Sequence, residues 1–242
     1  DLKYLDLYLN NFSYINSLTK LQKLEKLDLR DNEIYDYENL SKIKHLNTLH
    51  IRDSNLRALD FLKSVKHLKH LTIDSMEVDN LNVLENLIHL ESLEIQNNTI
   101  SDINFLKSLT NLTYLNASQN RITNITSISA LINLQFLQLN NNNISEISSL
   151  SSLLNLKSLG LSNNLISDIN DLDSLKRLID LDISENKISA IPLFIFELGL
   201  ELIQERYGQY GLVLSGNPLE SPPIEIISQG PASIFDWFGA IK

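Results

Sequence analysis

The chain has 242 residues, no cysteine and a formal net charge of −10 at pH 7. Without cysteine there is no thiolate nucleophile, and the acidic balance argues against nucleic acid or an anionic membrane as the main partner. No apolar run approaches the roughly 18 residues that are needed to span a bilayer, so membrane insertion is not expected.

One sequence pattern repeats along most of the chain. Its skeleton is Leu-x-x-Leu-x-Leu-x-x-Asn-x-Ile, and a complete copy starts at Leu112. The pattern returns every 22 residues without insertion or deletion, which identifies the chain as a member of the leucine-rich-repeat class. The repeats are similar to those of bacterial internalins. The first leucine of the nine copies stands at Leu2, Leu24, Leu46, Leu68, Leu90, Leu112, Leu134, Leu156 and Leu178.

Each unit predicts one short strand and one short helical return segment. In the copy that starts at Leu112, Leu115 and Ala117 alternate with outward-pointing residues, as in a half-buried strand. Later isoleucines step by three residues, which favours a 3₁₀ or α turn, and Asn104 and Thr126 stand where helix N-caps are expected. We therefore expect an α/β solenoid: a right-handed curved rod with a concave parallel sheet, short helices on the convex side and a helical C-terminal cap.

An asparagine follows the strand in most repeats. Its side-chain amide can both donate to and accept from backbone groups of the turn, so we expect these residues to form a buried structural ladder. Two repeats carry Ser54 and Met76 instead, and the turn at Met76 is expected to be irregular because methionine offers no useful donor. The expected ladder consists of Asn10, Asn32, Asn98, Asn120, Asn142, Asn164, Asn186 and Asn217.

The period fails after Pro192. We expect nine repeats over residues 1–198 and a C-terminal cap over 199–242, with an irregular tenth repeat at 209–219 and a helical end at 222–238. Phe196, Phe235, Trp237 and Phe238 are expected to cover the open end of the core. Because the skeleton begins at once with Leu2, we expect the chain to be a fragment or a processed product; a natural edge repeat is the alternative.

The C-terminal end has a second resemblance. The run from Gly216 to Ile226, followed by Gln229-Gly230 and the aromatic pair Trp237-Phe238, resembles the boundary after the repeats in bacterial Roco-type GTPases. The resemblance implies that Roc and COR domains could adjoin, although Gly230-Pro231 departs from the continuous helix of that family. Any GTPase activity would lie outside this chain, for which we expect neither enzymatic activity nor a cofactor.

The outward strand positions are the candidate binding residues. Tyr114 and Phe136 occupy the same position of successive repeats, so their rings are expected side by side, as a partner's anchor or as cross-strand packing that only stiffens the sheet. A charged cluster nearer the N-terminus is the other candidate. His50, His70 and Asp74 are residue types that can hold zinc, but they are scattered among flexible polar neighbours, and no metal is expected. The candidates are Tyr114, Phe136, Asn116, Gln138, Asn140, Tyr4, Tyr8, Arg30, Arg52, His50, His70 and Asp74.

Two functions fit this pattern. The first is a protein-interaction module, the regulatory or docking arm of a larger bacterial signalling protein in the cytoplasm, which binds a protein or peptide on its concave face. The alternative is an adhesin at the bacterial cell surface, whose nearly neutral middle repeats bind a sugar or a host receptor.

Overall fold

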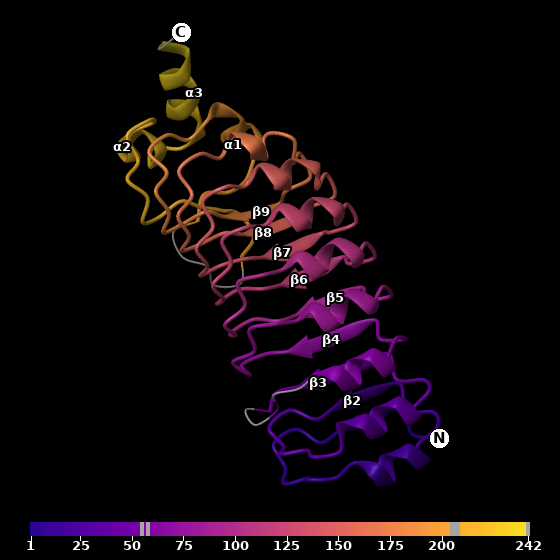
Figure 1. The fold of residues 1–242 in the computed structure, drawn as a ribbon. Helices are drawn as coiled ribbons and strands as arrows, with labels where there is room; N and C mark the ends of the chain where they lie inside the picture. The colour runs from indigo at the N-terminus through magenta and orange to yellow at the C-terminus, as the bar shows by residue number, and fades with distance from the viewer. Residues whose placement is uncertain (54–55, 57–58, 204–208, 241–242) are drawn as a thin grey trace.

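A sheet of parallel strands is the main element of the structure. The computed structural model describes residues 1–53, 56, 59–203 and 209–240, and within them ten strands pair in chain order in one open sheet (Figure 1). The strands are β1 (Tyr4–Asp6), β2 (Lys26–Asp28), β3 (Thr48–Ile51), β4 (His70–Ile73), β5 (Ser92–Glu94), β6 (Tyr114–Asn116), β7 (Phe136–Gln138), β8 (Ser158–Gly160), β9 (Asp180–Asp182) and β10 (Leu212–Val213).

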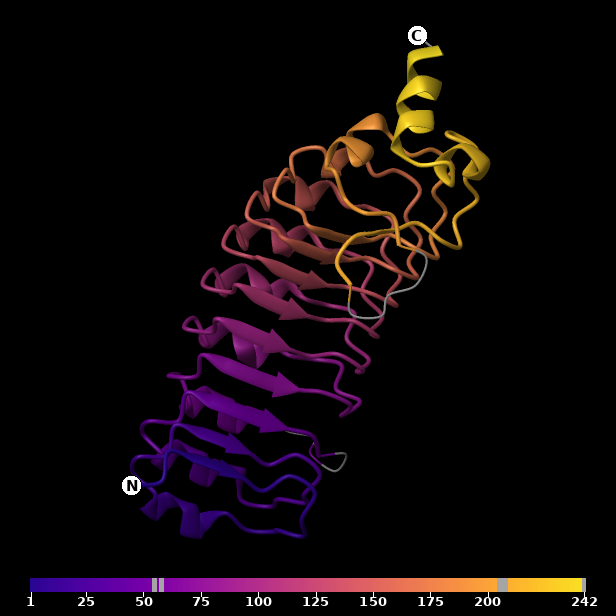
Figure 2. The same cartoon turned by 180° about the vertical axis from the view of Figure 1, so that it is seen from behind.

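Short 3₁₀ helices return the chain from one strand to the next. They lie on the side of the rod opposite the strands, as the two views together show (Figures 1 and 2). The tight helix suits a repeat of 22 residues, which leaves room for little more than one helical turn. The helices are η1 (Asn16–Lys20), η2 (Tyr37–Lys42), η3 (Asp60–Ser64), η4 (Asn82–Asn86), η5 (Asn104–Ser108), η6 (Thr126–Ala130), η7 (Ser148–Ser152) and η8 (Asn170–Leu172).

The core is a continuous stack of leucine and isoleucine between strands and helices. Leu93, Leu115 and Leu137 are in register on β5, β6 and β7, and each is 0% exposed. Burying one such side chain contributes about 1.5–3 kcal/mol, so the repeat is stabilised mainly by its neighbours. The fold class expected from the sequence is confirmed. Among the described residues, no helix is both long and apolar enough to cross a membrane.

Asn104 and Thr126 are not the N-caps that the sequence led us to expect. They are the first residues of their helices, and their backbone N–H groups donate to the side chains of Asp102 and Asn124, each at 2.8 Å. The N-cap residue directly before each of these two helices is a buried isoleucine, Ile103 or Ile125, whose side chain belongs to the core. The polar side chain that accepts from the first helical N–H therefore lies one residue before the N-cap position.

The asparagine side chains bridge successive turns. Asn120 Oδ1 accepts from the backbone N–H of Ile100 at 3.0 Å, and its Nδ2 lies 2.9 Å from the carbonyl oxygen of Ile95 and 3.1 Å from that of Ala117. Asn10 donates only within its own turn, whereas the others reach into the preceding repeat. The residues that do so are Asn32, Asn98, Asn120, Asn142, Asn164, Asn186 and Asn217.

The two repeats without the asparagine behave differently. Ser54 lies outside the described residues, but its neighbour Asp53 is buried and accepts from the backbone N–H of Ile34 at 3.3 Å. At Met76, Ser75 and Glu77 both have a positive φ, 57° and 56°, where the following repeats have one such residue before the asparagine. The irregular turn expected at Met76 is thus observed.

In the described part of the C-terminal region there are three α helices: α1 (Leu193–Glu197), α2 (Ile224–Ile227) and α3 (Pro231–Ala240), which projects from the end of the rod (Figure 2). Phe196 and Phe238 lie with ring centroids 6.3 Å apart and pack against the core. Phe235, in contrast, is 44% exposed, so its expected place over the core end was wrong. It points away because Ile234 fills the buried position of α3.

Candidate functional site: the strand face

Tyr114 and Phe136 lie side by side on the outward face of the sheet, which we call the strand face. They are register partners on β6 and β7, with ring centroids 6.4 Å apart and ring planes at 39°. Both side chains are half-buried, and burial, followed by the nearby Glu94 carboxylate, raises the pKa of Tyr114. The pair therefore presents part of two rings to solvent while packing across the strands.

The amides beside these rings already bond to one another. Gln138 Nε2 donates to Ser158 Oγ at 3.2 Å, and Asn140 Nδ2 donates to Gln138 Oε1 at 3.1 Å. Asn116 Oδ1 accepts from the backbone N–H of Ser118 at 3.1 Å. A Cβ at Gly160 would collide with the Gln138 and Asn140 amides, so glycine leaves the space that they occupy. These hydrogen bonds hold the amides beside the rings in place, and the carboxylate of Glu94 also lies near Tyr114.

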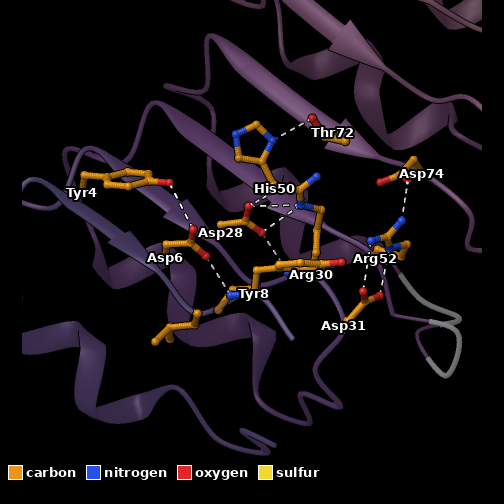
Figure 3. Close-up of polar contacts among 12 residues, drawn as sticks. Tyr4, Asp6, Tyr8, Asp28, Arg30, Asp31, His50, Arg52, Thr72 and Asp74 are labelled. Carbon is orange, nitrogen blue, oxygen red and sulfur yellow. Dashed lines mark hydrogen bonds and ion pairs between the residues drawn. The ribbon is translucent and has the colours of Figure 1, made fainter. Parts of the chain in front are cut away.

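A second set of candidates forms a charged cluster on the first four strands (Figure 3). Arg30 bonds through two nitrogens to Asp28, the last residue of β2, with Nη2 2.5 Å from Oδ2. Arg52 holds Asp31 in the same forked manner at 2.8 and 3.0 Å, and its Nη1 lies 3.5 Å from Asp74 Oδ2. Forked pairs of this kind fix the direction of both guanidinium groups.

Tyr8 lies beneath both arginines. The guanidinium carbons of Arg30 and Arg52 are 5.3 and 5.8 Å from its ring centroid, within the range of a cation–π contact. Burial opposes ionisation of Asp28, but hydrogen bonds from Arg30 outweigh it and lower the pKa of Asp28. The cluster is thus an assembly of paired charges around one exposed tyrosine.

The remaining candidates are at the edge of this cluster. The Tyr4 hydroxyl donates to Asp6 at 3.5 Å, and His50 Nδ1 is 2.8 Å from Thr72 Oγ1. Burial lowers the pKa of His50. His70 is in register with Thr48 and Ser92 and has no hydrogen bond to the cluster among the described residues. In the same part of the chain, no group of three or more His, Cys, Asp or Glu side chains is placed to hold a metal ion.

Asp28, Asp31 and Asp6 are the members that sequence reasoning missed. Asp28 stands two residues before Arg30, on the same side of the strand, and this spacing was a usable signal. Asp31 follows the strand in a residue with a positive φ of 54°, and its contact with Arg52 of the next repeat could not be inferred from spacing alone.

The repeated turns, the single parallel sheet and its outward polar and aromatic face define a leucine-rich-repeat protein. The family described as "Leucine Rich repeats (2 copies)" matches residues 88–131, 110–152 and 132–174, and the chain belongs to the leucine-rich-repeat family. No curated protein sequence matches the chain.

Solved structures show which leucine-rich-repeat proteins the chain is similar to. An internalin (inlF) from Listeria monocytogenes is 31% identical over 93% of this chain and 71% of its own, with a TM-score of 0.77. Internalin C2 from the same species is 30% identical over 72% of this chain and 77% of its own, with a TM-score of 0.68. TLR13, solved in complex with ssRNA13, is 25% identical; the match covers 91% of this chain and 35% of that one, with a TM-score of 0.68. Leucine-rich-repeat folds of this kind are typically binding modules without enzymatic activity.

Proposed function

We propose that the chain binds a protein partner across its strand face, with Tyr114 and Phe136 as the anchor. The observation that carries the proposal is the in-register aromatic pair, which keeps part of both rings in solvent between rigid, uncharged amides. Aromatic side chains are common energetic centres of interfaces, and a fixed polar surround lowers the entropy that is lost on binding.

The competing explanation is that the rings only stiffen the sheet. Cross-strand aromatic pairs contribute about 0.2–1 kcal/mol to folding, so packing alone gives a modest advantage. The two explanations differ in what the removal of the rings does. A packing pair changes stability without changing binding, whereas an anchor changes binding more than stability.

The charged cluster around Tyr8 is a second contact area for the same partner. It lies on β1 to β4, on the same face as the aromatic pair on β6 and β7. Its arginines are already neutralised by Asp28, Asp31 and Asp74. We therefore assign it to orientation of the partner more than to affinity.

Two contexts for this binding are proposed. The similarity to two Listeria internalins supports an adhesin or receptor-binding role at a bacterial surface. The alternative, an arm of a cytoplasmic signalling protein with adjoining Roc and COR domains, is supported only by the residues around Gly216 to Ile226. The break between α2 and α3 at Gly230-Pro231 weakens it. A search of the complete reading frame for a phosphate-binding loop separates the two contexts.

The anchor is tested with a double variant, Tyr114→Ala with Phe136→Ala. The matched control is Ile132→Ala with Leu154→Ala, two exposed apolar residues that also occupy one position of successive repeats but lie off the strand face. Partners are captured from a native extract of the host or the source cell, and thermal unfolding is recorded for both variants. Loss of capture in the aromatic variant alone supports the proposal; retention of every partner with lower stability contradicts it.

A further inference from the structure

Charge is divided between two long edges of the first four repeats. The edge after the strands carries the exposed acids Glu33, Glu77 and Asp79. The opposite edge, where each 3₁₀ helix returns to the next strand, carries seven exposed lysines, which we call the basic edge: Lys3, Lys20, Lys23, Lys42, Lys44, Lys66 and Lys69. In a chain with a net charge of −10, such a concentration of lysine is a local feature that the overall composition does not explain.

The repeat geometry arranges these lysines in a band along the rod. Lys20 and Lys42 occupy one position of successive repeats, and Lys44 and Lys66 occupy another. The backbone N–H of Lys69 donates to the carbonyl oxygen of Asn47 at 2.8 Å, which fixes this edge to the sheet. Neighbouring strands are about 4.8 Å apart, so the two lysines of each pair are one short step apart along the rod, while the band as a whole is not a single regular column.

The ion pairs at the basic edge neutralise only some of its lysines, so the edge keeps a positive charge. Lys3, Lys23 and Lys69 pair with Glu25, Asp1 and Glu91 at 2.6–2.7 Å. These pairs are exposed and contribute little, so a ligand can replace them. Among the described residues, no ion pair is formed by Lys20, Lys44 or Lys66.

A polar groove continues the basic edge toward the middle of the rod. It has a volume of about 620 Å³ and is lined by His67, Lys69, His89, Glu91, Asn111 and Thr113. Its lining contains no phenylalanine, tyrosine or tryptophan, and its only rings are the imidazoles of His67 and His89. It therefore lacks the large aromatic side chains that commonly anchor a protein interface or stack on the bases of a single-stranded nucleic acid. Histidine, asparagine and threonine side chains suit the hydroxyl groups of a sugar.

We propose that the basic edge and this groove bind a sulfated polysaccharide. The lysines contact sulfate groups, which are ionised at every physiological pH, and the groove contacts sugar hydroxyls. A polymer with several charges per disaccharide can engage several lysines of this band at once, whereas a polysaccharide with carboxylates alone carries fewer charges over the same length. Lysine supplies compact charge without the forked geometry that arginine brings to phosphates.

The test compares two triple variants of the full chain. Lys20→Gln, Lys44→Gln and Lys66→Gln remove three lysines that form no ion pair among the described residues, and Lys107→Gln, Arg121→Gln and Lys187→Gln remove the same charge from exposed sites elsewhere. The probe is a heparin oligosaccharide, measured by fluorescence anisotropy. We expect the first triple to weaken binding about tenfold and to reduce its dependence on salt, and the second to leave affinity nearly unchanged. Thermal unfolding of both variants confirms that each is folded.

Four results would overturn the proposal. The first is no binding of the heparin oligosaccharide at about 150 mM salt, and the second is an equal loss of affinity in both triples. The third is equal affinity for a desulfated oligosaccharide, which would show that sulfate is not recognised. The fourth is tighter binding of a DNA or RNA fragment of similar charge that depends on the same lysines, which would assign the edge to nucleic acid.

Discussion

The Tyr37 hydroxyl donates to Asp53 Oδ2 at 3.1 Å in the interior of the second and third repeats. The same carboxylate oxygen accepts from the backbone N–H of Ile34, the type of donor that an asparagine satisfies in later repeats. Asp53 therefore substitutes for a missing rung of the ladder. Burial, followed by the charge of Asp53, raises the pKa of Tyr37.

This relationship gives the first prediction. Asp53→Ala leaves the Ile34 N–H and the Tyr37 hydroxyl without an acceptor and should destabilise the chain by about 2–3 kcal/mol. Asp53→Asn keeps an acceptor oxygen and should lower the free energy of unfolding by clearly less. Urea unfolding of the two variants measures the difference; equal losses would show that Asp53 acts through its charge and not as an acceptor.

The regular ladder gives the second prediction. Asn120→Ala removes bonds to three backbone carbonyls and one N–H in a buried site and should cost about 2 kcal/mol. Asn10→Ala removes bonds at an exposed end of the rod and should cost little. Comparable losses of unfolding free energy in the two variants would contradict the role assigned to the buried amides.

The turn at Met76 gives the third prediction. Its two left-handed residues, Ser75 and Glu77, and the missing amide should allow this turn to open more readily than the turns at Asn120 and Asn142. Amide hydrogen exchange should therefore be faster around Met76. Equal protection of the backbone amides in the three turns would contradict this prediction.

His50 gives a prediction about pH. Burial lowers its pKa in the folded chain, so near its ordinary value of 6.5 the unfolded chain binds more protons than the folded one. His50 thus contributes stability that is complete above pH 6.5 and is lost as the pH falls through the lowered folded pKa. Unfolding free energies from pH 7 to 5 should fall less steeply in His50→Gln than in the unmodified chain, and an unchanged slope would refute this.

We propose that residues 199–242 act as a cap over the last repeat. Ile234 is buried, and Phe238 packs on Phe196 and the core. A chain that ends at residue 198 should expose this core end and aggregate or lose cooperative unfolding. Light scattering and thermal unfolding test this expectation, and a soluble truncation with a sharp transition would remove the cap assignment.

The sequence by itself determined the architecture. A strict period places every leucine of one repeat over its counterpart in the next, so Leu93, Leu115 and Leu137 had to stack once one turn was formed. The same reasoning placed Tyr114 beside Phe136 and located the break at Gly230-Pro231 between α2 and α3. These features depend on contacts between equivalent positions, which a period specifies completely.

Only the tertiary structure decided the contacts that break the period. Arg30 turns to Asp28 of its own repeat, whereas Arg52 turns to Asp31 of the preceding repeat and to Asp74 of the next. Asp53 takes the place expected for residue 54, and Asp102 rather than Asn104 supplies a capping group. A long or charged side chain has several partners within reach, and its choice depends on burial and competing hydrogen bonds that exist only once the neighbouring turns are in place.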